Sequence, residues 1–334
     1  MKSTIAGSLP KPRWLSTPDQ LWAGWLHEGD VLAEAKRDAV RLAVTEQEQA
    51  GLHIVSDGEQ TRQHFVTTFI EGLEGVDAEN RAVVKIRRRY EASVPRVVGP
   101  VSRKEGVFVH DARFLRSLTD HPIKAQLPGP MTMADTLKDE HYGDMEQLAR
   151  EFATILNQEA RELAEAGVDL VQFDEPAFNV FLTEVADWGV EALESAAAGI
   201  EAETAVHICY GYGVKANIDW KSTLGHEWRQ YEATFPLLAA SSIDQVSLEI
   251  AGSHVPMEVL DLLGDKSVQA GVIDVATHNV ETPDEVARLI ASVAEHIRPE
   301  RIYPSTNCGM VPLDRRVAVA KMNALGAGTA LYSG

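Results

Sequence analysis

Short apolar runs rich in β-branched residues alternate along the chain with longer segments of helical periodicity, and this alternation restricts the fold more than any other feature. A parallel strand that is buried on both faces is apolar almost throughout, so such runs are typical of a parallel sheet covered by helices. Three intervening segments, residues 30–51, 145–167 and 282–297, have amphipathic helical spacing. We interpret eight runs as strands: residues 3–8, 52–59, 123–130, 170–176, 204–211, 245–250, 268–275 and 301–309.

Eight strands alternating with helices in 334 residues predict an α/β protein with a single (β/α)8 TIM barrel, residues 1–334 forming one domain. The alternative is a doubly wound open sheet, which we disfavour because no G-x-G-x-x-G sequence opens a helical segment. Residues 60–122 form an insertion between the second and third expected strands and contain the basic run 85–99. We expect a hairpin on the barrel rim there. We expect its arginines to face solvent, the alternative being an anionic ligand or partner.

The charge balance excludes several classes of partner. The chain has 31 Lys and Arg residues against 50 Asp and Glu residues, a formal net charge of -19. Nucleic acids and anionic membrane surfaces repel so acidic a chain, and no apolar stretch is long enough to span a membrane. We therefore expect no nucleic-acid partner and no membrane partner. The N-terminal sequence lacks the apolar core of a signal peptide, which predicts a cytoplasmic location.

The chain has only two cysteines, and one of them lies two residues from a histidine. In the expected strand 204–211, His207 and Cys209 point to the same side, near the carboxyl end where barrel active sites form. Glu249 ends the sixth expected strand within an apolar run, and Cys308 follows the eighth. Thiolate, imidazole and carboxylate are zinc ligands, so we predict that these four side chains bind Zn²⁺. For His207 and Cys209 taken alone, ordinary core packing is the alternative.

The expected ligand charges favour one class of reaction. Two thiolates and a carboxylate make zinc a poor activator of water and suit it to binding a substrate thiol, which loses its proton and stays nucleophilic. We predict no catalytic side chain beyond this zinc-activated thiolate. Inward-facing acids at other strand ends could bind an ammonium group, and the loop containing Ser8 could bind a carboxylate. The sequence therefore predicts alkylation of an amino acid that carries a thiol, the alternative for each acid being a hydrogen bond within the barrel rim.

The chain contains, in this order, the motifs IAGSLPKP, SDGEQTRQHFV, QLPGPMT, QFDEPAF, HICYG, SLEIAGSH, GVIDV and NCGM. In sequence and in order, these motifs resemble the catalytic domain of the cobalamin-independent methionine synthase family. The resemblance implies a zinc-dependent transfer of a methyl group to homocysteine, with His207, Cys209, Glu249 and Cys308 as the zinc ligands. The implied contacts to homocysteine are Ile5, Gly7, Ser8, Glu59 and Asp174.

The chain departs from the folate-using members of that family at two places. Those members have a tryptophan soon after the PGPxT motif, where this chain has Ala134, Asp135 and Thr136. They also have a histidine at the position of Ala276, whereas here His278 lies two residues further on. Methyltetrahydrofolate is a poor methyl donor unless its nitrogen is protonated, so the loss of both groups predicts a different donor.

The short core members of the family, which this chain resembles most, suggest what that donor is. We expect a methylated corrinoid such as methylcobalamin, a corrinoid protein or another methyl-delivery protein, rather than methyltetrahydrofolate polyglutamate. Two other functions are alternatives: a zinc-thiol alkyltransferase of the coenzyme M type, and a non-catalytic zinc-binding protein.

Overall fold

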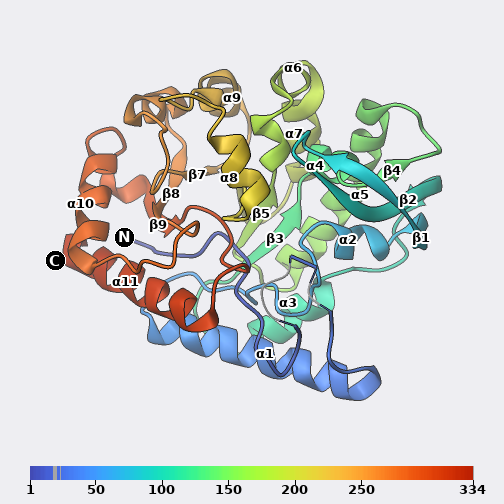
Figure 1. Cartoon of the computed structure of the whole chain (residues 1–334), viewed down its shortest axis with the longest axis horizontal. Helices are drawn as coiled ribbons and strands as arrows, with labels where there is room; N and C mark the ends of the chain where they lie inside the picture. The colour runs from blue at the N-terminus through green and yellow to red at the C-terminus, as the bar shows by residue number, and fades with distance from the viewer. Residues whose placement is uncertain (18–20, 23, 334) are drawn as a thin grey trace.

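A parallel sheet forms the centre of the computed structural model, which describes residues 1–17, 21–22 and 24–333 (Figure 1). The sheet has six strands in the order β3-β5-β6-β7-β8-β9. Every residue of β3, β5, β7 and β9 is buried, which explains why these segments are apolar runs in the sequence. The strands are β3 (Lys124–Pro128), β5 (Leu170–Asp174), β6 (Glu203–Ile208), β7 (Gln245–Glu249), β8 (Ser267–Ile273) and β9 (Ile302–Thr306).

Two extended segments close this sheet into a barrel, but they form single hydrogen bonds rather than ladders. They occupy the places of the first two strands, so the predicted (β/α)8 barrel is confirmed while regular strands at 3–8 and 52–59 are not. The second segment ends in a turn, where Gly58 and Glu59 have φ angles of 60° and 56°, in the left-handed region. The closing contacts are Thr4 N–H to the Pro304 carbonyl and Ile54 N–H to the Ser3 carbonyl, both 3.0 Å, and a bridge between Val55 and Ile123.

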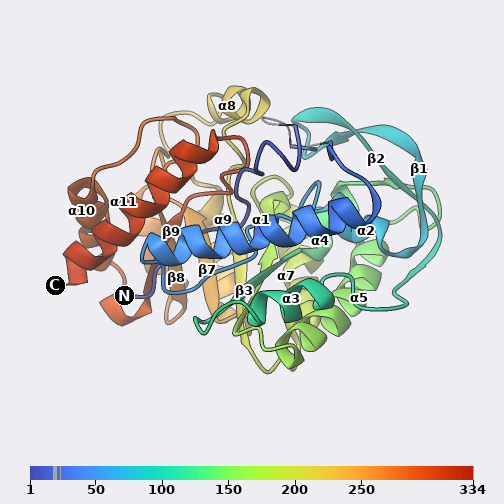
Figure 2. The same ribbon diagram turned by 90° about the horizontal axis from the view of Figure 1, so that it is seen from below.

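The insertion between the second and third barrel positions contains a long antiparallel hairpin, as predicted. It consists of β1 (Glu74–Ile86) and β2 (Tyr90–Ser102), and the short strand β4 (Lys138–Asp139) pairs with β2 in parallel. Both views place this hairpin at the end of the molecule far from α10 and α11 (Figures 1 and 2). Two short helices flank it: α2 (Thr67–Glu71) and α3 (Val109–Arg116).

Three helices on the outside of the barrel correspond to the predicted ones. They are α1 (Gly29–Gln49), α5 (Met145–Glu165) and α10 (Pro283–Ala294). Helix α10 begins with a capping box, in which Thr282 and Glu285 each accept the other's backbone N–H. The other helices are α4 (Pro130–Asp135), α6 (Leu182–Glu184), α7 (Val190–Ala197), α8 (Lys215–Lys221), α9 (Gln230–Ala240) and α11 (Arg315–Ser333), with short 3-10 or π turns at Pro176–Asn179, Val185–Gly189, Met257–Leu263 and Pro299–Arg301.

The two ends of the chain lie close together. Helix α11 contacts both α10 and α1, and Figure 2 shows α1 and α11 on the same side of the molecule. The ammonium group of Met1 donates a hydrogen bond to Ser333 Oγ at 3.3 Å. Within the described residues, no helix combines the length and the apolar character needed to cross a membrane.

Candidate metal and substrate site

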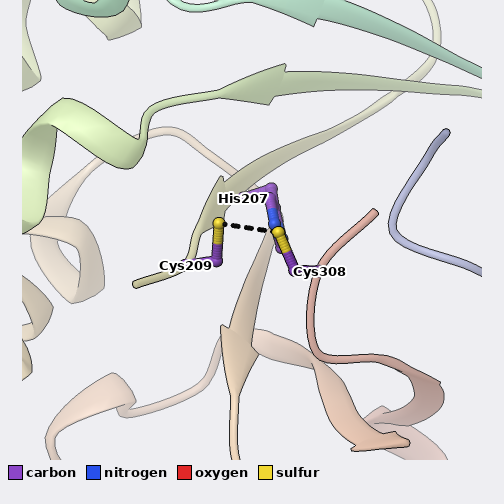
Figure 3. Close-up of side chains that lie close together, drawn as sticks. All are labelled: His207, Cys209 and Cys308. Carbon is purple, nitrogen blue, oxygen red and sulfur yellow. Dashed lines mark hydrogen bonds between the residues drawn. The ribbon is translucent and has the colours of Figure 1, made fainter. Parts of the chain in front are cut away.

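Three of the predicted metal ligands meet at the carboxyl ends of β6 and β9, where Figure 3 shows their side chains converging. His207 lies in β6, Cys209 follows that strand directly, and Cys308 lies just beyond β9. One ligand atom from each residue lies within 4.8 Å of the other two, and the two Sγ atoms are 3.2 Å apart. All three residues are buried. Two sulfurs and one imidazole nitrogen at this spacing suit a single zinc ion.

The two thiols are electrostatically coupled. A hydrogen bond from Cys308, together with the neighbouring His207, lowers the pKa of Cys209 well below its usual value. The same hydrogen bond, followed by burial, raises the pKa of Cys308. Two thiolates this close repel each other, and a bound cation removes that cost because it allows both to ionise. The donor set therefore fits a metal ion.

Strand register orients the imidazole ring. His207 in β6 is paired with Ser247 in β7, and the Ser247 hydroxyl lies 2.8 Å from His207 Nδ1. A metal-binding histidine usually makes a hydrogen bond through its other ring nitrogen, which fixes the ring and its tautomer. The contact to Ser247 engages Nδ1, so Nε2 is the nitrogen available to a metal.

Glu249, the fourth predicted ligand, lies beside this group but has other partners. It ends β7 and is 1% exposed. One carboxylate oxygen lies 2.5 Å from Nζ of Lys221 in α8, and the other accepts the N–H of Tyr210 at 3.0 Å. Burial raises the pKa of Glu249 to about 7, although Lys221 acts in the opposite direction. Its role as a metal ligand stays a prediction.

A pocket opens beside the three ligands, and its lining includes four of the five predicted homocysteine contacts, Gly7, Ser8, Glu59 and Asp174. The fifth, Ile5, is fully buried and lies outside the lining. A Cβ atom on Gly7 would lie 2.6 Å from a Glu59 carboxylate oxygen, so a larger residue there would displace the acid from its present position. A ligand bound in this pocket would lie between the thiols and the acids.

The two acids in the pocket lining are buried and weakly acidic. Burial raises the pKa of Glu59 to about 7, with Arg62 opposing and the Asp174 charge adding to the rise. Burial likewise raises the pKa of Asp174 to about 6, and one of its oxygens accepts a hydrogen bond from Gln172 at 2.7 Å. A ligand ammonium group would stabilise both carboxylates.

The pocket also contains groups that the sequence did not indicate. Arg87 and Arg89 reach it from the turn between β1 and β2, and Tyr212 and Asn217 reach it from the segment after β6. The expectation that the hairpin arginines face solvent holds for Arg88, which is exposed, and is wrong for Arg87, which is 5% exposed. For Arg87 and Arg89, the available signal in the sequence was the run of three consecutive arginines. Loop residues such as Tyr212 carry no periodic pattern that could have indicated them.

Residues 1–328 match the family described as "Cobalamin-independent synthase, Catalytic domain". The chain belongs to the cobalamin-independent methionine synthase family. A methionine synthase of Saccharolobus solfataricus is 31% identical over 333 residues, covering 98% of this chain and 94% of the relative. One of Sulfurisphaera tokodaii is 30% identical over 324 residues, covering 96% of this chain and 89% of the relative. Members of this methionine synthase family are methyltransferases of methionine biosynthesis, with homocysteine as the methyl acceptor.

Solved structures agree with this assignment. A B12-independent methionine synthase from a Shewanella species, solved in complex with selenomethionine, superposes with a TM-score of 0.97. It is 60% identical, and the match covers 98% of this chain and 96% of that one. A vitamin-B12 independent methionine synthase assigned in Listeria monocytogenes gives a TM-score of 0.71 at 18% identity, covering 97% of this chain and 96% of that one. The second likeness shows the fold alone.

Proposed function

We propose that this methionine synthase is a zinc-dependent homocysteine methyltransferase whose methyl donor is not methyltetrahydrofolate polyglutamate. One observation carries the proposal: His207, Cys209 and Cys308 line the same pocket as the buried acids Glu59 and Asp174. The first group suits a metal that binds a thiol, and the second suits an ammonium group. Homocysteine carries both functional groups.

The roles of the residues follow from their chemistry. His207, Cys209 and Cys308 would hold zinc, with Glu249 as a fourth ligand. When bound, zinc supplies positive charge that lets a thiol ionise near neutral pH. Glu59 and Asp174 would hold the ammonium group of homocysteine. Ser8 and the backbone from Ile5 to Gly7 would hold its carboxylate. The Shewanella relative, solved with selenomethionine, supports an amino-acid ligand of this size and shape.

The surroundings of Ala276 and Asp135 support a donor other than the folate. Asp135 accepts the Arg87 N–H at 2.9 Å and so stabilises the hairpin turn. Its side chain offers no aromatic surface to a folate. The Ala276 side chain has no proton to give, and His278 is exposed and outside the described pocket lining. The family's cobalamin-independent character gives the corrinoid part of the prediction no support. A methyl-delivery protein or another methylated small molecule is the preferred donor.

A second candidate is alkylation of a thiol of the coenzyme M type, which carries a sulfonate. Arg87 and Arg89 in the pocket favour it, because guanidinium groups bind such anions. The two buried acids favour homocysteine instead, because a sulfonate thiol has no ammonium group to pair with them. Methylation assays with homocysteine and with 2-mercaptoethanesulfonate as competing acceptors separate the two.

Metal analysis and zinc-edge absorption spectroscopy test the zinc site. We expect one zinc per chain in the purified protein, lost in Cys308→Ser, and one nitrogen or oxygen neighbour of zinc replaced by sulfur when homocysteine is added. Ser253→Ala, at a partly buried position outside the pocket lining, is the matched control and should retain zinc. A protein without zinc, or a spectrum that homocysteine leaves unchanged, would contradict the proposal.

A separate assay tests the donor. The zinc-loaded enzyme and homocysteine are incubated with methyltetrahydrofolate triglutamate, with methylcobalamin, or with a cell extract fractionated for methyl-delivery activity. We expect methionine formation to depend on the extract fraction and to be absent with the folate. Rapid turnover with the folate alone would refute the donor part and leave the zinc and homocysteine parts standing.

A further inference from the structure

The turn between β1 and β2 consists of three consecutive arginines in an unusual backbone conformation. Ile86 pairs with Tyr90, so Arg87, Arg88 and Arg89 alone connect the strands. Arg87 and Arg88 have φ angles of 46° and 57°, a region that residues with a Cβ atom rarely adopt. Such conformations persist when the surrounding structure holds them, and they are common at ligand-binding sites.

Contacts from three other parts of the chain hold this turn. Asp135 of α4 accepts the Arg87 N–H at 2.9 Å. Arg89 donates from Nη1 to the carbonyl of Tyr210 at 3.0 Å, directly after the metal-ligand candidate Cys209. Its guanidinium also lies 3.4 Å from the ring centroid of Trp220 in α8. The turn is therefore fixed over the pocket by the barrel itself.

The guanidinium groups that reach the pocket are short of partners. Within the part of the chain that the structure describes, Arg87 Nη1 and Arg89 Nε and Nη2 are buried without a hydrogen-bond partner, and neither arginine forms a salt bridge with a carboxylate. The other terminal nitrogen of Arg87, Nη2, donates to the Tyr90 hydroxyl at 3.1 Å. Arg87 is 5% exposed. Burial, followed by the neighbouring Arg87 charge, lowers the pKa of Arg89 to about 9. Arg89 is thus a largely buried cation with free donors, which is costly unless an anion binds it.

We infer that Arg87 and Arg89 form a binding site for an oxyanion, a carboxylate or phosphate group of the methyl donor, in the same pocket as the metal-ligand candidates. The guanidinium fork matches the spacing of two oxygens on one carboxylate or phosphate, which explains why arginine rather than lysine suits such a site. Arg88 of the same turn stacks on Phe181 instead, 4.9 Å from the ring centroid, and is exposed. Of the three arginines in the turn, only Arg87 and Arg89 therefore form the site.

The oxyanion has two sources in this pocket. One is the donor, and this assignment rests on the proposed function. The other is the carboxylate of homocysteine itself. We assign the site to the donor because the loop containing Gly7 and Ser8 lies in the same lining and offers the amino-acid carboxylate its own partners. The anion site as such depends only on the unpaired donors of Arg87 and Arg89.

Calorimetric titration of inorganic phosphate into zinc-loaded protein saturated with L-methionine tests the inference. We expect saturable binding in the wild type and in Arg88→Gln, the matched control that removes one charge from the same turn. In Arg89→Gln the affinity for phosphate should fall at least tenfold, and the affinity for L-methionine should change less than twofold. Arg89→Lys, which keeps the charge but not the fork, should bind phosphate with intermediate affinity.

The other outcomes decide between the sources. Equal phosphate binding in Arg89→Gln and Arg88→Gln would overturn the anion site. A tenfold loss of L-methionine affinity in Arg89→Gln, with no phosphate binding once methionine is bound, would overturn the donor assignment in favour of the amino-acid carboxylate. A second test of the anion site uses the wild type alone. Phosphate should protect Arg87 and Arg89, but not Arg88, from modification by phenylglyoxal. Neither measurement requires methyl transfer, so failure of the proposed function would not imitate failure of the site.

Discussion

At the residue scale, burial has made Glu59 a weak acid, and substrate binding should therefore depend on pH. Burial raises the pKa of Glu59 to about 7, so below this pH the carboxyl group of the free protein is neutral and cannot pair with an ammonium group. We expect the affinity for L-methionine to be constant above about pH 7 and to fall by up to about tenfold per pH unit below it. Calorimetry from about pH 6 to about pH 8.5 measures this. The product is the better ligand here because it has no thiol to titrate.

Glu59→Gln separates this effect from other titrations. The variant should bind L-methionine more weakly than the wild type at high pH, and the fall between about pH 7 and pH 6.5 should disappear. The side chains of Gln and Glu have nearly the same shape, so Gly7 can still approach position 59. A wild-type affinity that stays constant across this range would show that Glu59 is not the partner of the ammonium group.

Lys221 has no role in the proposed chemistry, yet its contact with Glu249 provides a test of the fourth metal ligand. The pair is buried, with the Lys221 side chain 11% exposed and that of Glu249 1% exposed. Removing one partner of a buried ion pair leaves an uncompensated charge and costs about 3–5 kcal/mol of unfolding free energy. We expect Lys221→Met to show such a loss without metal and a smaller one with zinc, because zinc would then compensate the Glu249 charge. Chemical denaturation with and without zinc measures both.

Lys215→Met is the matched control for that experiment. Lys215 lies in the same helix and pairs with Asp219 at 2.8 Å, but both side chains are exposed, at 88% and 60%. Exposed pairs contribute about 0–1 kcal/mol, and zinc should make no difference to this one. If Lys221→Met loses the same free energy with and without zinc, Glu249 does not act as a metal ligand.

At the scale of secondary-structure elements, the residue after β5 fixes the start of α4. Glu175 is fully buried, and its carboxylate accepts the N–H groups of Met131 and Thr132 at 3.0 and 2.9 Å and the Thr132 hydroxyl at 2.7 Å. Gly129 leaves room for it, because a Cβ atom there would lie 2.2 Å from the Glu175 carboxyl carbon. The Pro-Gly-Pro motif at the start of α4 and the Asp-Glu-Pro motif at the end of β5 therefore contact each other.

Glu175→Ala should destabilise the protein strongly, because it leaves three buried donors without an acceptor. At about 1–3 kcal/mol for each unsatisfied group, we expect a loss of about 3 kcal/mol or more in the free energy of unfolding by urea. Glu175→Gln keeps one acceptor oxygen and should lose less. Glu165→Ala, at the exposed end of α5, should change the stability by less than about 0.5 kcal/mol. A loss in Glu175→Ala no larger than in this control would show that the carboxylate does not hold α4.

The elements that could be predicted from the sequence are those whose burial is uniform. Strands β3 and β5 to β9 are buried on both faces, so their apolar runs identified them to within a few residues. The segments 3–8 and 52–59 also begin as short apolar runs, but they form only isolated hydrogen bonds and a single bridge, and a composition-based prediction does not distinguish these from a ladder.

The candidate site likewise contains residues that the sequence could place and residues that it could not. His207 and Cys209 could be placed together because alternation along a strand fixes their common side, and Cys308 because strands in a parallel barrel end at one rim. That these residues bind zinc stays a prediction. The pairing of Glu249 with Lys221 and the burial of Arg87 depend on irregular connections, α8 and a hairpin turn, whose path over the barrel follows from packing rather than from periodicity.

At the scale of the whole molecule, the three ligand candidates join parts of the barrel that are distant in sequence. Cys209 and Cys308 are 99 residues apart, and only the closed barrel brings their sulfurs within 3.2 Å. A ligand that binds the folded state alone stabilises it by RT ln(1 + [L]/Kd), about 2.7 kcal/mol when the free ligand is at 100 times its Kd. We therefore expect zinc to raise the melting temperature by several degrees and a chelator to reverse the rise, as measured by calorimetry. Cys308→Ser removes one sulfur and should keep the fold. In this variant the zinc-dependent rise in melting temperature should shrink or vanish. An equal rise in the variant would mean that zinc stabilises the barrel from some other site, and the convergence of these side chains would then be core packing.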